Sequence, residues 1–215
     1  MNIYIILFFT ACILGLVPVL LFYSSKGRFS DSNFKGIVPF IWLVAIASFY
    51  EVIFSYYLKV NVEIWFKIYS FLEFILIIIL FSRQKNRPNR YYFWIFTVIY
   101  LIVFIFLLFA CQEYHFLKQD SFLNVVLIFF IISYATIWFY KNFKLMENNS
   151  LLELPFFYFL SGLLVYYSGT IVLSLLSESI VNSPMKIYDY WIVHICFLIL
   201  FRILLIVSVW KGRTK

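Results

Sequence analysis

Residues Tyr190 to Trp210 read YWIVHICFLILFRILLIVSVW. This run of 21 residues contains one arginine, Arg202, one histidine, His194, and no other residue that is charged or titrates near neutral pH. At 1.5 Å per residue, a helix of this length spans the roughly 30 Å hydrocarbon core of a bilayer. The run therefore predicts a membrane-crossing helix that carries two ionisable side chains into the membrane.

Six similar apolar runs precede it, separated by clusters of charged residues, Asn, Ser, Gly and Pro. The chain is 65% hydrophobic and 13% charged, which lies far from the composition of a water-soluble domain. We therefore predict an all-α fold, a polytopic integral membrane protein whose seven-transmembrane-helix bundle forms a single domain over residues 1–215. The expected crossings are 3–23, 37–58, 64–82, 91–111, 122–140, 154–177 and 190–210.

The distribution of Lys and Arg predicts the orientation of this bundle, because basic residues resist translocation. Of the 17 basic residues, 12 lie in the first, third and fifth connections and the C-terminal tail. We expect this side in the cytoplasm, with the N-terminus out and the C-terminus in, in the plasma membrane and most simply the bacterial inner membrane. The net charge of +7 is then a topology signal. No soluble basic surface is left to bind nucleic acid, and the lipid bilayer is the expected surrounding.

Two parts of the chain resemble each other. Val38-Pro39-Phe40 matches Leu154-Pro155-Phe156, and Glu51 and Tyr167 each stand twelve residues beyond the proline. This correspondence suggests a 3+1+3 duplicated triple-helix arrangement, with chance agreement between Phe-rich helices as the alternative. In helix number and repeat order such a layout resembles SWEET-type sugar transporters and the KDEL receptor. That resemblance carries over no functional residue.

Ionisable side chains deep in a bilayer cost several kcal/mol unless they are paired or face a cavity. The predicted helices contain four of them, and their depths suggest the pairs Glu51 with His194 and Glu73 with Arg202. Tyr167 brings a hydroxyl towards the same interior. These five residues are the expected ligand-binding or gating site. The alternative for Glu73 and Arg202 is a buried salt bridge that only fixes helix order.

Small residues mark one side of the predicted sixth helix. Ser161 and Ser168, like Gly162 and Gly169, are seven residues apart. This spacing places them on one helix face, where small side chains permit close helix packing.

Nothing in the sequence predicts an enzyme. An HExxH motif and a glycine-rich phosphate loop are both absent, and two histidines with scattered carboxylates form no metal-ligand cluster. The three cysteines have no paired spacing and are expected to be free thiols. We therefore expect no catalytic residues, no metal and no cofactor. The three cysteines are Cys12, Cys111 and Cys196.

Three functions fit these observations. The first is a ligand-sensing or signalling module that binds a small-molecule or lipidic ligand and works through another membrane or signalling protein, since its own connections are too short to form an output domain. The second is a small-solute transporter with a midplane polar site between two triple-helix repeats. The third is a structural or assembly subunit of a membrane complex, in which the polar residues only lock the bundle.

Overall fold

The computed structural model describes residues 3–24, 34–60, 63–84, 87–110, 116–145, 151–181 and 187–213. These ranges contain seven long helices, in accordance with the predicted all-α fold. Three short segments flank or continue two of them: a 3-10 turn η1 (Phe34–Ile37), a π-helix η2 (Glu51–Tyr57) and a 3-10 turn η3 (Leu151–Glu153). The seven helices are α1 (Ile3–Ser24), α2 (Val38–Tyr50), α3 (Glu63–Ser82), α4 (Arg90–Ala110), α5 (Phe116–Leu145), α6 (Pro155–Val181) and α7 (Ile187–Gly212).

Six helical segments within the described ranges are long and apolar enough to cross a membrane. They indicate a multi-pass integral membrane protein. Helix α3, which carries Lys67 and Glu73, is not among the six. The six segments are Ile3–Ser24, Phe34–Tyr57, Arg90–Leu107, Leu123–Lys144, Pro155–Leu173 and Trp191–Gly212.

Several helices extend beyond the apolar runs that predict them. Helix α5 begins at Phe116 rather than at residue 122, and α6 continues to Val181 rather than ending at 177. Helix α7 begins at Ile187, three residues before the predicted start. The apolar run marks the thickness of the hydrocarbon core, whereas a helix continues past it as long as the polar residues there favour helix.

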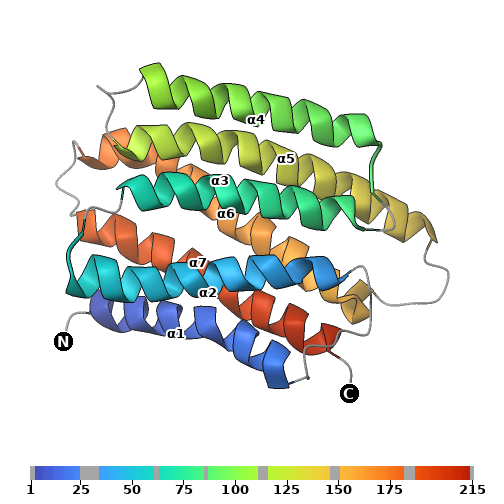
Figure 1. Ribbon diagram of the computed structural model, residues 1–215, viewed down its shortest axis with the longest axis horizontal. Coiled ribbons are helices and arrows are strands. Elements are labelled where there is room, and N and C mark those ends of the chain that lie inside the picture. Colours follow the sequence, from blue (N-terminus) through green and yellow to red (C-terminus); the bar gives the residue numbers. More distant parts are fainter. Residues whose placement is uncertain are drawn as a thin grey trace.

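Six helices form a closed ring, and neighbours along the chain run in opposite directions (Figure 1). Helices α1, α2 and α3 pack in chain order, as do α5, α6 and α7. The ring closes where α1 packs against α7 and α3 against α5. Helix α4 lies outside the ring, at the edge of the bundle, against α5 and α3 (Figure 1). The two termini lie at opposite ends of the bundle (Figure 1).

Aromatic rings fill the interior where α3, α4 and α5 meet. The rings of Phe74 and Tyr100 stack at 3.7 Å between centroids, and those of Phe81 and Tyr134 at 3.9 Å. The Tyr100 hydroxyl donates to the Ser70 carbonyl at 3.0 Å. Buried tyrosines of this kind combine a large apolar surface with a satisfied polar tip, as the absence of water in a bilayer core requires.

The segment η1–α2–η2 is continuous and changes geometry along its length. Pro39 lies in the first turn of α2, where its missing N–H costs no hydrogen bond. From Glu51 the helix widens to the π form, and no residue of η2 is buried. Beyond Tyr57, Lys59 adopts a left-handed conformation with φ of 50°, which is a common way to end a helix. Glu51 therefore stands where a largely buried α-helix passes into a partly exposed π-helix.

Candidate functional site

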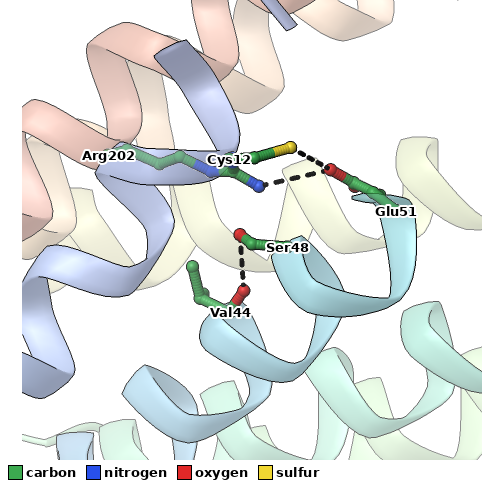
Figure 2. Close-up of polar contacts among 5 residues, drawn as sticks. All are labelled: Cys12, Val44, Ser48, Glu51 and Arg202. Carbon is green, nitrogen blue, oxygen red and sulfur yellow. Dashed lines mark hydrogen bonds and ion pairs between the residues drawn. The ribbon is translucent and has the colours of Figure 1, made fainter. Parts of the chain in front are cut away.

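Arg202 on α7 is the centre of a buried polar cluster. It is 2% exposed, and its Nη2 lies 3.8 Å from Oε2 of Glu51. The Cys12 thiol on α1 donates to the same carboxylate oxygen at 3.6 Å (Figure 2). A separation of 3.8 Å makes an ion pair but exceeds the length of a hydrogen bond. Three helices thus converge on one weakly joined charge pair.

The guanidinium of Arg202 is only partly satisfied. Its Nε and Nη1 are buried and have no hydrogen-bond partner among the described residues. Buried Arg side chains normally satisfy most of their five N–H donors, because each unpaired donor loses its hydration without compensation. Arg202 therefore has donor capacity that the surrounding helices leave unused.

The backbones around Arg202 approach closely because α1 has a glycine there. A Cβ built on Gly15 would lie 2.1 Å from Oγ of Ser48 and 3.2 Å from Cζ of Arg202. Ser48 itself donates to the Val44 carbonyl at 2.9 Å and is buried (Figure 2). The glycine thus makes room for both the serine and the guanidinium.

A second polar group adjoins the first on α3 and α6. Glu73 is 5% exposed, and its carboxylate lies beside the hydroxyls of Tyr69 and Tyr167. The Tyr167 hydroxyl is buried and lies beside this carboxylate, but it completes no hydrogen bond with the described residues. Tyr69 lies near Glu73 and also near Arg202 and Glu51, so it stands between the two groups.

The ring of His194 lies among aromatic side chains. It meets the rings of Tyr166 and Trp191 edge-on, at centroid distances of 5.9 and 5.8 Å. Arg202 lies about two helical turns further along α7. His194 thus lies between the rings of Tyr166 and Trp191, next to the polar cluster on α7.

The structure brings the five predicted site residues into one region, but it corrects both predicted pairs. Arg202 is paired with Glu51 instead of Glu73, and no ion pair joins Glu51 to His194 within the described residues. The reason is the direction of the side chains, which lean towards the N-terminus of their own helix. Helices α2 and α7 are antiparallel, so Glu51 and Arg202 lean towards each other. Glu73 lies on α3, which runs parallel to α7, and leans the same way as Arg202 (Figure 1).

The glycines predicted for packing lie against α7. A Cβ on Gly169 would fall 2.5 Å from the Phe197 ring, and one on Gly162 would fall 3.1 Å from Leu204 and Phe201. Ser168 is exposed and donates to the Val165 carbonyl of its own helix at 3.2 Å. Ser161, the other predicted packing residue, is half-buried.

Sequence reasoning missed the contribution of α1. Cys12 is the free thiol that was expected, but its donation to Glu51 was not foreseen. A signal existed, because the buried residues of α1 are its small ones, Ala11, Cys12, Gly15 and Pro18, at helical spacing. Of the other predicted thiols, Cys196 is free and exposed, and Cys111 lies outside the described residues.

The cluster offers donors to an anion rather than ligands to a metal. Among the described residues, no group of three or more His, Cys, Asp or Glu side chains is close enough to hold a metal ion. The fold and the cluster together define a multi-pass α-helical membrane protein with a buried, charged site. No protein-family model, curated protein or solved structure matches the chain significantly.

Proposed function

We propose that the chain is a non-enzymatic seven-helix membrane protein that senses a small or lipidic ligand and acts through a separate partner protein. The observation that carries this proposal is the guanidinium of Arg202. It is buried, two of its three nitrogens have no partner among the described residues, and the third lies 3.8 Å from a carboxylate. A buried charge with so little compensation costs several kcal/mol, which favours a role in binding over one in stability alone.

An acidic ligand group suits this site best. Carboxylates and phosphates form short, charge-assisted hydrogen bonds to a guanidinium, and these are stronger than a contact at 3.8 Å. A ligand can reach this site near Glu51, because the Glu51 side chain is 24% exposed. Glu51 is also the first residue of the π-helix η2, in which no residue is buried. Single π turns are frequent at functional sites, because they depart locally from regular helix geometry.

The expected response is a movement of α7. A ligand that occupies Arg202 weakens its attraction to Glu51 and so removes one link between α7 and α2. Arg202 also touches α1 at Gly15, so a shift of the guanidinium changes the packing of three helices at once. A ligand with different affinities for the two arrangements shifts the population between them, and a bound partner can read that change.

The proposal includes the orientation of the chain. We place the N-terminus outside and the C-terminus in the cytoplasm of a bacterial inner membrane, because 12 of the 17 basic residues lie in the first, third and fifth connections and the C-terminal tail. Helix α3 then serves as the seventh crossing. Its packing between α2, to which it is antiparallel, and α5, to which it is parallel, supports this role (Figure 1). A reporter fused to the C-terminus should be active only if it is of a type that works in the cytoplasm.

Ligand binding can be tested on the purified full chain in lipid nanodiscs. The melting temperature is measured with a panel of small carboxylates and phosphate esters, for the native chain and for Arg202→Leu. Sensing predicts at least one compound that stabilises the native chain and leaves Arg202→Leu unaffected. A tagged chain recovered from its native membrane should also retain a stoichiometric partner. A chain that binds none of these compounds and retains no partner would contradict the proposal.

Transport is the second candidate function, and the order of helices in the ring favours it. The contact of α1 with α7 corresponds to the contact of α5 with α3 if two triplets, α1–α3 and α5–α7, are equivalent. Such a duplicated arrangement with α4 outside supports a pair of bundles that rock around a central site. Against it, the π-helix η2 has no counterpart in the described part of α6.

Proteoliposomes separate the two candidates. Uptake of a compound that binds at Arg202 would make transport the function, because a sensor binds its ligand without moving it across the membrane. Binding without uptake, together with a retained partner, supports sensing. Both results depend on the same residue, so Arg202→Leu is the control in each assay.

A further inference from the structure

A second polar site lies at the other end of the bundle, away from Arg202. A pocket of about 810 Å³ opens between α3 and α4, where α3 ends and α4 begins. Its polar lining residues are Ser82, Arg87, Asn89, Arg90 and Thr97. Its apolar lining includes Ile78, Phe93 and Trp94. None of these residues belongs to the Arg202 cluster, so the two sites are independent.

The pocket changes from polar to apolar along the membrane normal. On α4, Arg90, Phe93, Trp94 and Thr97 are spaced three or four residues apart and share one helix face. From Arg90 to Thr97 the helix rises about 10 Å. The charged groups therefore stand at the end of the bundle, and a largely apolar wall extends from them towards its middle. The one polar residue of that wall, Thr97, donates its hydroxyl to the Phe93 carbonyl of its own helix. A phospholipid has the same order of groups.

The mouth of the pocket is positively charged. Arg87 and Arg90 are both exposed, and Lys141 of α5 donates through its Nζ to the Arg87 carbonyl at 2.9 Å. Arg87 donates through Nη1 to the Ser82 carbonyl, which holds its side chain across the pocket. Among the residues that the structure describes, none of those lining the pocket is acidic. Two arginines in the lining, with Lys141 beside one of them, favour an anion.

We propose that this pocket binds an anionic phospholipid, with the phosphate of its headgroup held by Arg87, Asn89 and Arg90. One acyl chain lies along Ile78, Phe93 and Trp94. The indole of Trp94 is 58% exposed and stands at the depth where tryptophans border the headgroup layer. Basic residues that only set topology need no pocket, whereas a basic hollow between helices with an apolar wall is the form that headgroup sites take. A soluble phosphate ester shares the headgroup chemistry but has nothing to cover the apolar wall.

Native mass spectrometry of the full chain can measure lipid retention with phosphatidylglycerol and with zwitterionic phosphatidylcholine. The test variant is the double substitution Arg87→Gln and Arg90→Gln. The matched control is Lys35→Gln with Lys144→Gln, two exposed lysines at the same end of the bundle that do not line the pocket. The expected result is a loss of phosphatidylglycerol affinity of about 30-fold in the test variant, because each basic residue contributes about a factor of five. The control should retain nearly all of its affinity.

A single variant and a competition with inorganic phosphate complete the test. Arg90→Gln alone leaves the Arg87 to Ser82 hydrogen bond in place, so it should weaken phosphatidylglycerol binding about fivefold without altering the fold. Millimolar inorganic phosphate should not displace the lipid. Equal losses in the test and control variants would mean that overall charge holds the lipid and would overturn the proposal. Displacement by phosphate, without preference for phosphatidylglycerol over phosphatidylcholine, would assign the pocket to a soluble phosphate and also overturn it.

Discussion

Gly15 on α1 lies so close to Ser48 on α2 that a Cβ at position 15 would come within 2.1 Å of the serine Oγ. The same Cβ would lie 3.2 Å from Cζ of Arg202. The absence of one methyl group therefore lets α1, α2 and α7 meet around a single guanidinium. Arg202 takes part both in the close packing at Gly15 and in the ion pair with Glu51. A larger side chain at position 15 therefore affects the same guanidinium as the loss of charge at position 51.

Gly15→Ala should destabilise the bundle by about 1–3 kcal/mol, the usual cost of an extra methyl group in a well-packed interior. The new Cβ must displace Ser48 Oγ, which now donates to the Val44 carbonyl. Thermal unfolding of the purified chain in detergent would measure the effect. Gly15→Ala combined with Ser48→Ala is the matched control and should recover most of the loss. No recovery would mean that Ser48 is not the residue that limits the space.

Glu51→Leu should destabilise the bundle more than the double variant Glu51→Leu with Arg202→Leu. The single change leaves a buried guanidinium without its carboxylate, at a cost of about 3 kcal/mol, whereas the double change removes both charges from an apolar interior. Melting temperatures of the four chains in one cycle would give the coupling between the two residues. Equal destabilisation in the single and double variants would contradict this expectation.

The same double variant also separates a binding site from a purely structural lock. If the charges only fix the order of helices, the folded double variant should keep its partner and its response. If Arg202 binds a ligand, the double variant should fold and fail to respond. Retained response in that variant would assign Glu51 and Arg202 to structure alone.

The positions of the helices could be predicted from the sequence because the length of an apolar run depends only on consecutive residues of the chain. Seven apolar runs led to seven helices, and the largest error in where a helix starts falls at α5, which begins six residues earlier than predicted. The bilayer core determines how long an apolar run must be, but it does not determine where the helix ends. Residues 116–121 are more polar and still helical for that reason.

The partners of the buried charges could not be predicted in the same way. The depth of each residue in the membrane, counted along its helix, placed Glu73 and Arg202 near one another. Such a depth refers to the Cα atom and takes no account of the direction in which a long side chain extends. Arg202 and Glu51 extend towards each other because their helices are antiparallel, and this closes the gap in depth between them. The π-helix at Glu51 has no marker in the residue pattern, and the close approach at Gly15 depends on a neighbouring helix.

Tyr167→Phe should leave the bundle about as stable as before, because the hydroxyl it removes is buried and lies beside the Glu73 carboxylate without completing a hydrogen bond with the described residues. Tyr100→Phe is the matched control, since that hydroxyl donates to the Ser70 carbonyl at 3.0 Å and should cost about 1 kcal/mol to remove. Both tyrosines are at most 2% exposed, so differences in burial do not enter. If the proposed ligand site is correct, Tyr167→Phe should also weaken the stabilising effect of a bound carboxylate. A loss of stability as large as in Tyr100→Phe would show that Tyr167 has a hydrogen-bond partner in the membrane.

Gly169→Ala should weaken the packing of α6 against α7 more than Gly162→Ala does. A Cβ at position 169 would penetrate the Phe197 ring, at 2.5 Å from two of its carbons, while a Cβ at position 162 meets its neighbours at 3.1 Å. The ring must therefore rotate or α7 must move away, whereas a few tenths of an ångström suffice at position 162. Thermal unfolding would rank the two variants, and Phe197→Leu should restore much of the stability of Gly169→Ala by removing the ring. Because Phe197 and Arg202 share α7, a displaced α7 also shifts the guanidinium. Gly169→Ala should then lower ligand affinity although it touches no residue of the site, and unchanged affinity would mean that the ring rotates while α7 stays in place.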